Sequence, residues 1–135
     1  MASLQMSDAT TNRKHIRHVH VVVVHDPECN VEELCGRLRK EFVVRECPTT
    51  FGALSELATR QHACLICCVG GRIGAEEFRG MVGQVAKEQA SLIVFIAMPS
   101  AKPEDFDCME RMGRHWLDHT VPVDEVLALV RAVSA

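Results

Sequence analysis

The stretch ACLICCVGG, residues 63–71, is a short apolar run that ends in two adjacent cysteines and two glycines. An apolar run of this length, closed by glycines, is typical of a strand buried inside a sheet. It predicts a buried strand whose last residues, Cys67 and Cys68, lie near a site at the end of the strand. Side chains alternate along a strand, so these two cysteines are expected to point to opposite faces.

Four further segments have the composition of strands. They are HVHVVVV (18–24), FVVRECP (42–48), LIVFIAM (92–98) and HWLDHTV (115–121). The first of them is a continuous β-branched run, which predicts a strand buried on both faces. The last is shorter and more polar, and we expect it at an edge of the sheet.

Amphipathic segments separate these strands. After the first strand, Val31, Leu34 and Leu38 recur at helical spacing, and Asn30 followed by Glu33 predicts a capped helix start. Similar stripes follow the other strands. Strands that alternate with helices of this length predict a parallel sheet with helices on both faces, because parallel strands need crossover connections.

Length and composition indicate how many domains the chain forms and which classes of partner are unsuited to it. The chain has 135 residues, 47% of them apolar and 24% charged, with a formal net charge of −3. We expect one α/β domain over residues 17–135 after a flexible N-terminal tail, residues 1–16. The acidic balance argues against nucleic acid as a partner, and no apolar run approaches the roughly 20 residues that cross a membrane.

The cysteines point to a reducing compartment. There are seven, an odd number at irregular spacing, and several lie inside apolar runs. The N-terminal stretch MASLQMSDATTNRK has no apolar core of the kind that directs secretion. We therefore expect a cytoplasmic protein in which cysteine serves mostly as a small hydrophobic residue.

Five strand–helix units of these lengths resemble the receiver domain of response regulators, over nearly the whole chain from about His18. The resemblance implies a CheY-like or flavodoxin-like fold, a doubly wound five-stranded parallel sheet of strand order 2-1-3-4-5. It also implies a site at the carboxyl ends of the strands. Receivers hold Mg²⁺ there with acidic residues and accept a phosphoryl group on an aspartate.

The resemblance places five residues of this chain at the signature positions of receivers. His25 and Asp26 stand where the first strand ends in two acids, and Cys68 stands at the phosphorylated aspartate. Ala97 replaces the Thr or Ser that ends the fourth strand, and His119 replaces the Lys after the fifth. Only Asp26 keeps the residue type of the pattern.

These replacements imply a degenerate receiver, or pseudo-receiver. A thiolate with one remaining carboxylate is a poor site for Mg²⁺, which prefers hard oxygen ligands. The sequence also lacks a GxSxG motif and any convincing set of nucleophile, base and acid. The leading hypothesis is a non-enzymatic signalling module, without a cofactor, that acts through protein–protein contact and is not phosphorylated on aspartate.

Two alternatives belong to other classes. His25, Asp26, Cys68 and His119 are together a donor set suited to Zn²⁺, so the module could be a metal-responsive switch, or a redox-responsive one through Cys68. Against this, no local spacing such as CxxC supports a metal, and the plain interpretation is rim histidines beside a packed cysteine. The third hypothesis is a residual phospho-receiver of a phosphorelay, modified at Asp26.

Two other patterns have plain interpretations. His18 and His20 share one face at the start of the first strand, away from the expected site, and are expected to be solvated or satisfied histidines. Gly70, Gly71 and Arg72 lack the spacing and the lysine of a phosphate-binding loop, so they predict a turn between strand and helix.

A contact surface is the last prediction. By resemblance, receivers present the face of their fourth helix, fifth strand and fifth helix to a protein partner or to a second copy. In this chain the face draws on Asp105, Glu110, Arg111, Arg114, Trp116 and Asp118. Trp116 is the only tryptophan; it is either an interface anchor or a cover for the core edge.

Overall fold

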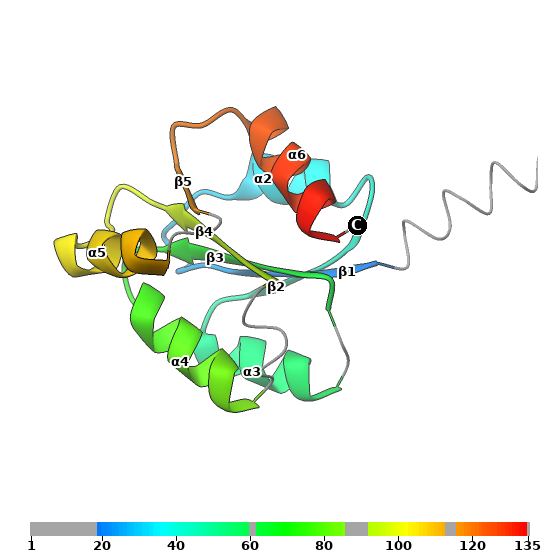
Figure 1. Ribbon diagram of the computed structural model, residues 1–135. Helices are drawn as coiled ribbons and strands as arrows, with labels where there is room; N and C mark the ends of the chain where they lie inside the picture. Colours follow the sequence, from blue (N-terminus) through cyan, green and yellow to red (C-terminus); the bar gives the residue numbers. More distant parts are fainter. Residues whose placement is uncertain (1–18, 60–61, 86–91, 113–115, 135) are drawn as a thin grey trace, which may run out of the picture.

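A computed structural model describes residues 19–59, 62–85, 92–112 and 116–134 of the chain. The expected tail, residues 1–16, lies outside the described residues, as do His18 and Arg114. The described segments form one sheet flanked by helices (Figure 1).

Five parallel strands make up the sheet, in the order β2-β1-β3-β4-β5. Their bounds are β1 His20–Val24, β2 Val43–Cys47, β3 Cys64–Val69, β4 Ile93–Ala97 and β5 Trp116–Asp118. Every neighbouring pair in this order is parallel. The predicted fold class and strand order are therefore confirmed, and the more polar fifth segment does lie at an edge.

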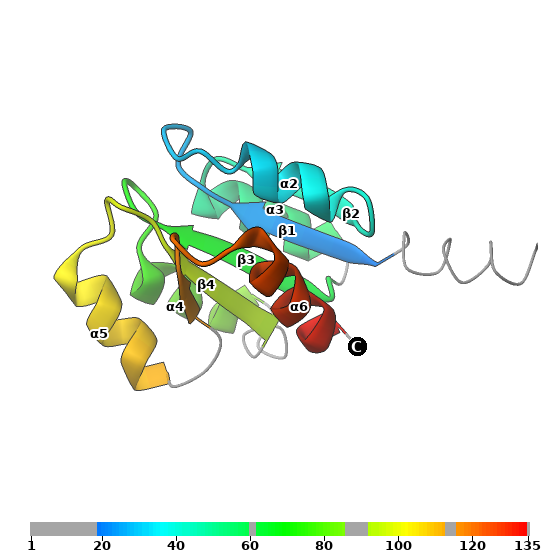
Figure 2. The same cartoon turned by 90° about the horizontal axis from the view of Figure 1, so that it is seen from above.

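The helices cover the sheet in two layers. Their bounds are α2 Glu32–Leu38, α3 Thr50–Thr59, α4 Ala75–Val85, α5 Pro103–Met112 and α6 Val123–Ser134. Figure 1 shows α2 and α6 on one side of the sheet and α3 and α4 on the other. Figure 2, a view from above, shows α2 and α6 on the side of the sheet nearer the viewer, with α5 at the left of the molecule.

Side-chain alternation along the strands divides the core into two clusters. On β3, Leu65, Cys67 and Val69 face the layer of α3, α4 and α5, whereas Ile66 and Cys68 face α2 and α6. All six residues of β3 are buried. A strand buried on both faces reads as a continuous apolar run, which is why this segment could be recognised from sequence.

The start of α2 differs from the predicted capping box. The helix begins at Glu32, and Val31 occupies the cap position without a side-chain hydrogen bond. Asn30 instead accepts the backbone N–H of Glu32 at 3.2 Å through its side-chain oxygen. One N–H of the first turn is thus satisfied from outside the helix.

No described helix has both the length and the apolar character that a membrane crossing requires.

Candidate functional site

Asp26 lies just beyond β1, at the carboxyl edge of the sheet, and its carboxylate joins two loops. One oxygen, Oδ1, accepts the backbone N–H of Glu28 at 3.0 Å, and the other, Oδ2, accepts that of Arg72 at 3.0 Å. The residue is only 6% exposed. The N–H groups of Glu28 and Arg72 stabilise the anion and, with the Arg72 charge, hold the pKa of Asp26 below its ordinary value, against the opposing effect of burial.

The loop that meets Asp26 is a tight turn between β3 and α4. Gly70 and Ile73 exchange two backbone hydrogen bonds, of 2.9 and 3.0 Å. Gly71 has φ +58°, and a Cβ atom there would lie 2.5 Å from Oδ2 of Asp26. Glycine is required because the turn adopts a left-handed conformation and approaches the carboxylate closely. The turn predicted at Gly70-Gly71-Arg72 is confirmed.

His119 follows β5 and is anchored on the end of β4. Its backbone N–H and its ring Nδ1 both donate to the carbonyl oxygen of Ala97, at 2.9 and 3.0 Å. A carbonyl only accepts, so Nδ1 carries a proton, and in the neutral ring Nε2 is an acceptor. Asp118 lies 3.4 Å from the same Nδ1.

Two neighbouring pockets open at this edge of the sheet. The larger, about 460 Å³, is lined by Asp26, Glu28, Cys29, Asn30, Gly71, Met98, Pro99, Ser100 and His119. The smaller, about 170 Å³, runs between α2 and the start of α6 and reaches Cys68. Asn30, Met98 and His119 line both. Ligands of doubly wound sheets bind at this edge, beyond the carboxyl ends of the strands.

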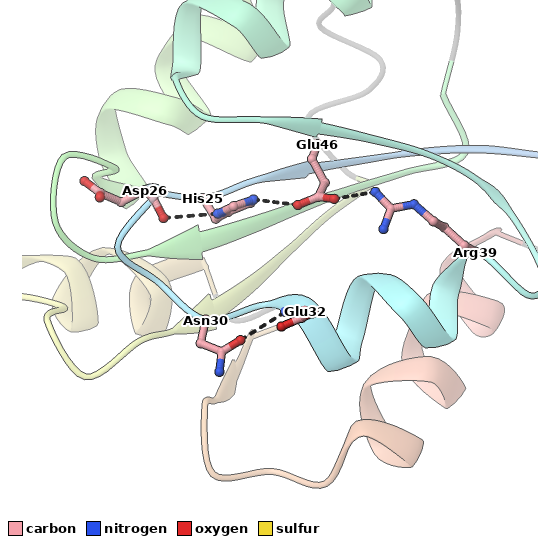
Figure 3. Close-up of polar contacts among 6 residues, drawn as sticks. All are labelled: His25, Asp26, Asn30, Glu32, Arg39 and Glu46. Carbon is pink, nitrogen blue, oxygen red and sulfur yellow. Dashed lines mark hydrogen bonds and ion pairs between the residues drawn. The ribbon is translucent and has the colours of Figure 1, made fainter.

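His25 turns away from the larger pocket toward β2. Its Nδ1 donates to the carbonyl of Asp26 at 3.1 Å, and its Nε2 lies 3.0 Å from Oε1 of Glu46. Glu46 also forms an ion pair with Arg39 (Figure 3). The hydrogen bond from Arg39 holds the pKa of Glu46 below its ordinary value. Both ring nitrogens of His25 are thus engaged within the protein.

Cys68 is buried in the cluster beneath α2 and α6, with no exposed surface. Burial raises the pKa of its thiol, and the neighbouring Cys35 and Cys29 raise it further. Cys67 is equally buried on the opposite face, among the residues beneath α3, α4 and α5. Neither thiol has the exposure or the nearby cation that activates a reactive cysteine.

The structure brings together some of the five signature residues and separates others. Asp26 and His119 line the larger pocket, and Cys68 and His119 line the smaller. Ala97 is fully buried; its methyl packs under the α3, α4 and α5 layer while its carbonyl holds His119. Within the described ranges, His25, Asp26, Cys68 and His119 do not converge on one point, and no group of three or more such side chains is placed to bind a metal ion.

All seven cysteines are free thiols, and six of them are buried. The exception is Cys29, which is partly exposed in the wall of the larger pocket. Burial, together with the charge of Asp26, raises the pKa of its thiol.

The residues of the predicted contact surface have different environments. Glu110 and Arg111 are exposed on α5. Trp116 is partly buried, and its ring meets Phe106 edge to face at 5.9 Å between centroids, so it covers the edge of the core. Asp118 is partly exposed and accepts hydrogen bonds from the backbone and the hydroxyl of Thr120, which hold its pKa below the ordinary value.

Asp105 does not lie on that surface. It is 8% exposed, and its carboxylate accepts the N–H of Lys102 at 3.0 Å and the N–H of Ala75 at 3.1 Å. The first bond satisfies the N–H of the residue that precedes α5, and the second satisfies the N–H of the first residue of α4. Its carboxylate is used inside the molecule, to set two helix starts side by side.

Sequence reasoning missed several residues of the larger pocket, among them Cys29, Met98, Pro99 and Ser100. Met98 to Ser100 directly follow β4, so their place after a predicted strand was the available signal. The contact of Asp26 with the turn after β3 had a signal only in the two glycines. The hydrogen bond joins Asp26 to a backbone N–H 46 residues away, and no pattern of side chains in the sequence indicates such a bond.

No protein-family model matches the chain, and no curated protein sequence matches it. Solved structures do match its fold. The adenylate cyclase structure from Rhodopirellula baltica superposes with a TM-score of 0.69 at 15% identity, covering 85% of this chain and 86% of that one.

Two further matches are response regulators. The chemotaxis protein CheY4 of Vibrio cholerae has a TM-score of 0.67 at 18% identity, covering 85% of this chain and 98% of its own. The response regulator TrrA of Thermotoga maritima, solved with Mg²⁺ and BeF, has a TM-score of 0.64 at 16% identity, covering 86% and 99%. The chain therefore has the fold of a response regulator receiver domain.

Proposed function

We propose that the chain is a receiver-like signalling module that acts through protein–protein contact, without enzymatic activity and without phosphorylation on aspartate. The observation that carries this proposal is the state of Asp26. Its two carboxylate oxygens accept backbone N–H groups of two loops, at Glu28 and Arg72. A carboxylate engaged in this way stabilises the positions of the two loops.

The third strand supports the same conclusion. No acidic residue occurs between Cys64 and Ile73, the whole of β3 and the turn after it. The alignment of this segment with receivers can therefore be shifted by a residue or more without placing a phosphoacceptor there. Mg²⁺ binding in phosphoryl-transfer sites uses one or two carboxylates together with phosphate oxygens. Here the buried carboxylate of Asp26 already accepts two backbone N–H groups, and Glu28, the other acid of the pocket wall, is exposed.

The positions that respond to phosphorylation in receivers are also changed. Ala97 has no hydroxyl, and its side chain is buried in the core. His119 is fixed on the Ala97 carbonyl through two hydrogen bonds. These residues support a site that keeps one conformation, so a constant surface for a partner fits the geometry better than a phosphorylation-driven switch does.

The contact surface that we propose combines α5, β5 and the neighbouring start of α6. Glu110 and Arg111 supply exposed charges of opposite sign. Asp118 contributes a partly exposed carboxylate at the end of β5, where the sheet has an open edge. Surfaces with both charge signs favour a partner of complementary pattern, which includes a second copy of the chain.

The test is incubation with acetyl phosphate and Mg²⁺, followed by measurement of the intact mass at neutral pH. We expect no added phosphoryl group under conditions in which a conventional receiver, run in parallel, is modified. A modified fraction that disappears in the Asp26→Asn variant would establish the residual phospho-receiver and contradict the proposal.

The contact surface is tested separately by sedimentation equilibrium and by cross-linking at native protein concentration. Arg111→Glu reverses one charge of the surface and is expected to weaken any association that uses it. Arg79→Glu, on the exposed side of α4, makes the same charge reversal on another helix and should have no effect. Equal effects of the two variants would assign the association to net charge and remove this surface from it.

A further inference from the structure

The larger pocket has a chemistry that the proposed protein contact does not use. It lies between the end of β1 and the loops after β3, β4 and β5. In the order β2-β1-β3-β4-β5 the chain reverses its direction of winding between β1 and β3. Doubly wound sheets bind ligands in the crevice outside this point. A volume of about 460 Å³ is within the range of small-molecule sites.

The charges in the wall of this pocket have one sign. Among the described residues, its lining includes the acids Asp26 and Glu28 but no lysine or arginine. Asp26 is only 6% exposed, and the hydrogen bonds from Glu28 and Arg72, together with the nearby charge of Arg72, which is outside the pocket lining, favour its ionised form. A recessed carboxylate that stays charged favours a positively charged ligand over a neutral or anionic one.

Asp26 and His119 both offer hydrogen-bond acceptors in this pocket. Each oxygen of Asp26 receives one backbone N–H, and a carboxylate oxygen can accept a second. Nδ1 of His119 donates to Ala97, and within the described part of the chain its Nε2 has no hydrogen-bond partner. A complementary ligand therefore brings donors to Asp26 and His119. Met98 and Pro99 add apolar wall beside these acceptors.

From this combination we infer that the larger pocket binds an alkylammonium group, with the ammonium donating to Asp26 and His119 and the alkyl part against Met98 and Pro99. An ammonium has three donors that adapt to the acceptors available. Mg²⁺ demands near-octahedral oxygen geometry and loses water reluctantly, which the engaged carboxylate of Asp26 and the exposed one of Glu28 do not offset. The inference is independent of the proposed absence of phosphorylation.

The same group occurs on free amines and on the lysine side chains of proteins. The probes are n-butylammonium chloride for the free amine and Nα-acetyl-lysine N-methylamide for a protein lysine. Each is titrated at constant ionic strength into ¹⁵N-labelled full-length chain, and amide shifts are followed by NMR. Sodium butyrate is the control, because it has an alkyl chain of similar length and the opposite charge.

We expect saturable shifts from the ammonium probes at Glu28, Gly71 and Ser100, and no saturable shifts there from butyrate. Asp26→Asn should weaken binding by at least about tenfold, which corresponds to 1.4 kcal/mol. Glu104→Gln, an exposed acid on α5 outside the pocket, should bind like the unmodified chain. If Asp26→Asn does not give a folded spectrum, His119→Phe, which removes the Nε2 acceptor, is expected to weaken binding in the same direction.

The relative affinity of the two probes distinguishes the sources. Tighter binding of the lysine derivative assigns the pocket to a lysine of a partner protein, and tighter binding of butylammonium assigns it to a free amine. The inference is overturned if neither ammonium probe gives saturable shifts, if butyrate shifts the same residues to the same extent, or if Asp26→Asn and His119→Phe both bind with unchanged affinity.

Discussion

At the scale of single residues, Asp26 shows how one side chain can change its role within a familiar fold. Its position after β1 could be predicted from the sequence, and so could its place at the carboxyl edge of the sheet. Its partners could not, because they are backbone N–H groups of Glu28 and Arg72. Every residue except proline has a backbone N–H, so the sequence does not indicate which residues will donate to the carboxylate.

This role makes a prediction about acid stability. The pKa of Asp26 is lowered from 3.8 in the folded chain, so its stabilisation is present above that value and is lost as pH falls through the folded-state pKa. The urea midpoint of the unmodified chain should therefore fall more between about pH 6 and about pH 2.5 than that of Asp26→Asn.

The difference between the two proteins isolates Asp26, because Glu46 and Asp118, whose pKa values are also lowered, contribute equally to both. Glu104→Gln serves as the control for an exposed acid and should follow the unmodified chain. If Asp26→Asn loses as much stability on acidification as the unmodified chain does, the carboxylate does not stabilise the loops.

The cysteines allow a second prediction at this scale. Cys29 is the only thiol of the seven with intermediate exposure, so we expect it to be alkylated first by iodoacetamide in the native chain. Cys68, fully buried with a raised pKa, should react only as fast as the chain unfolds. Peptide mapping after timed alkylation measures both. Native-state labelling of Cys68 at the rate of Cys29 would restore the redox hypothesis.

At the scale of elements, the turn between β3 and α4 decides the shape of the site. It is short, it needs a left-handed residue at Gly71, and it places the N–H of Arg72 on Asp26. The glycines in the sequence predicted a turn, but not that it would be fastened to the end of β1. Asp105 is a similar case, since its partners are the backbone N–H groups of Lys102 and Ala75, which no residue type in the sequence indicates.

Two glycine substitutions test this element. Gly71→Ala forces a side chain into a left-handed conformation, which costs about 1–2 kcal/mol, and brings its Cβ to 2.5 Å from Oδ2 of Asp26. We expect a loss of unfolding free energy of at least that size by urea denaturation. Gly80→Ala is the matched control: it lies in α4 with no atom within 4 Å of the added Cβ, so it should gain about 0.5–1 kcal/mol. A neutral Gly71→Ala would show that the turn moves freely away from Asp26.

At the scale of the whole molecule, the fold was the more predictable part. Continuous apolar runs such as LIVFIAM indicate buried strands, and the apolar residues at helical spacing between these runs indicate buried helix faces. Both can be recognised because apolar residue types are the ones that become buried. The site was less predictable because it depends on which face each strand end presents. Cys68 illustrates this: its orientation opposite to Cys67 on β3 could be predicted from the pleat, but its complete burial under α2 and α6 could not.

The central claim is that this receiver-like fold does not respond to phosphorylation chemistry, and the fluorescence of Trp116 tests it most directly. Trp116 is the only tryptophan and packs against Phe106 of α5, beside the proposed contact surface. Beryllofluoride mimics a phosphoryl group on aspartate and requires Mg²⁺ to bind. We predict that adding both leaves the emission spectrum of Trp116 unchanged. A saturable change that requires Mg²⁺ and is lost in Asp26→Asn would contradict the claim.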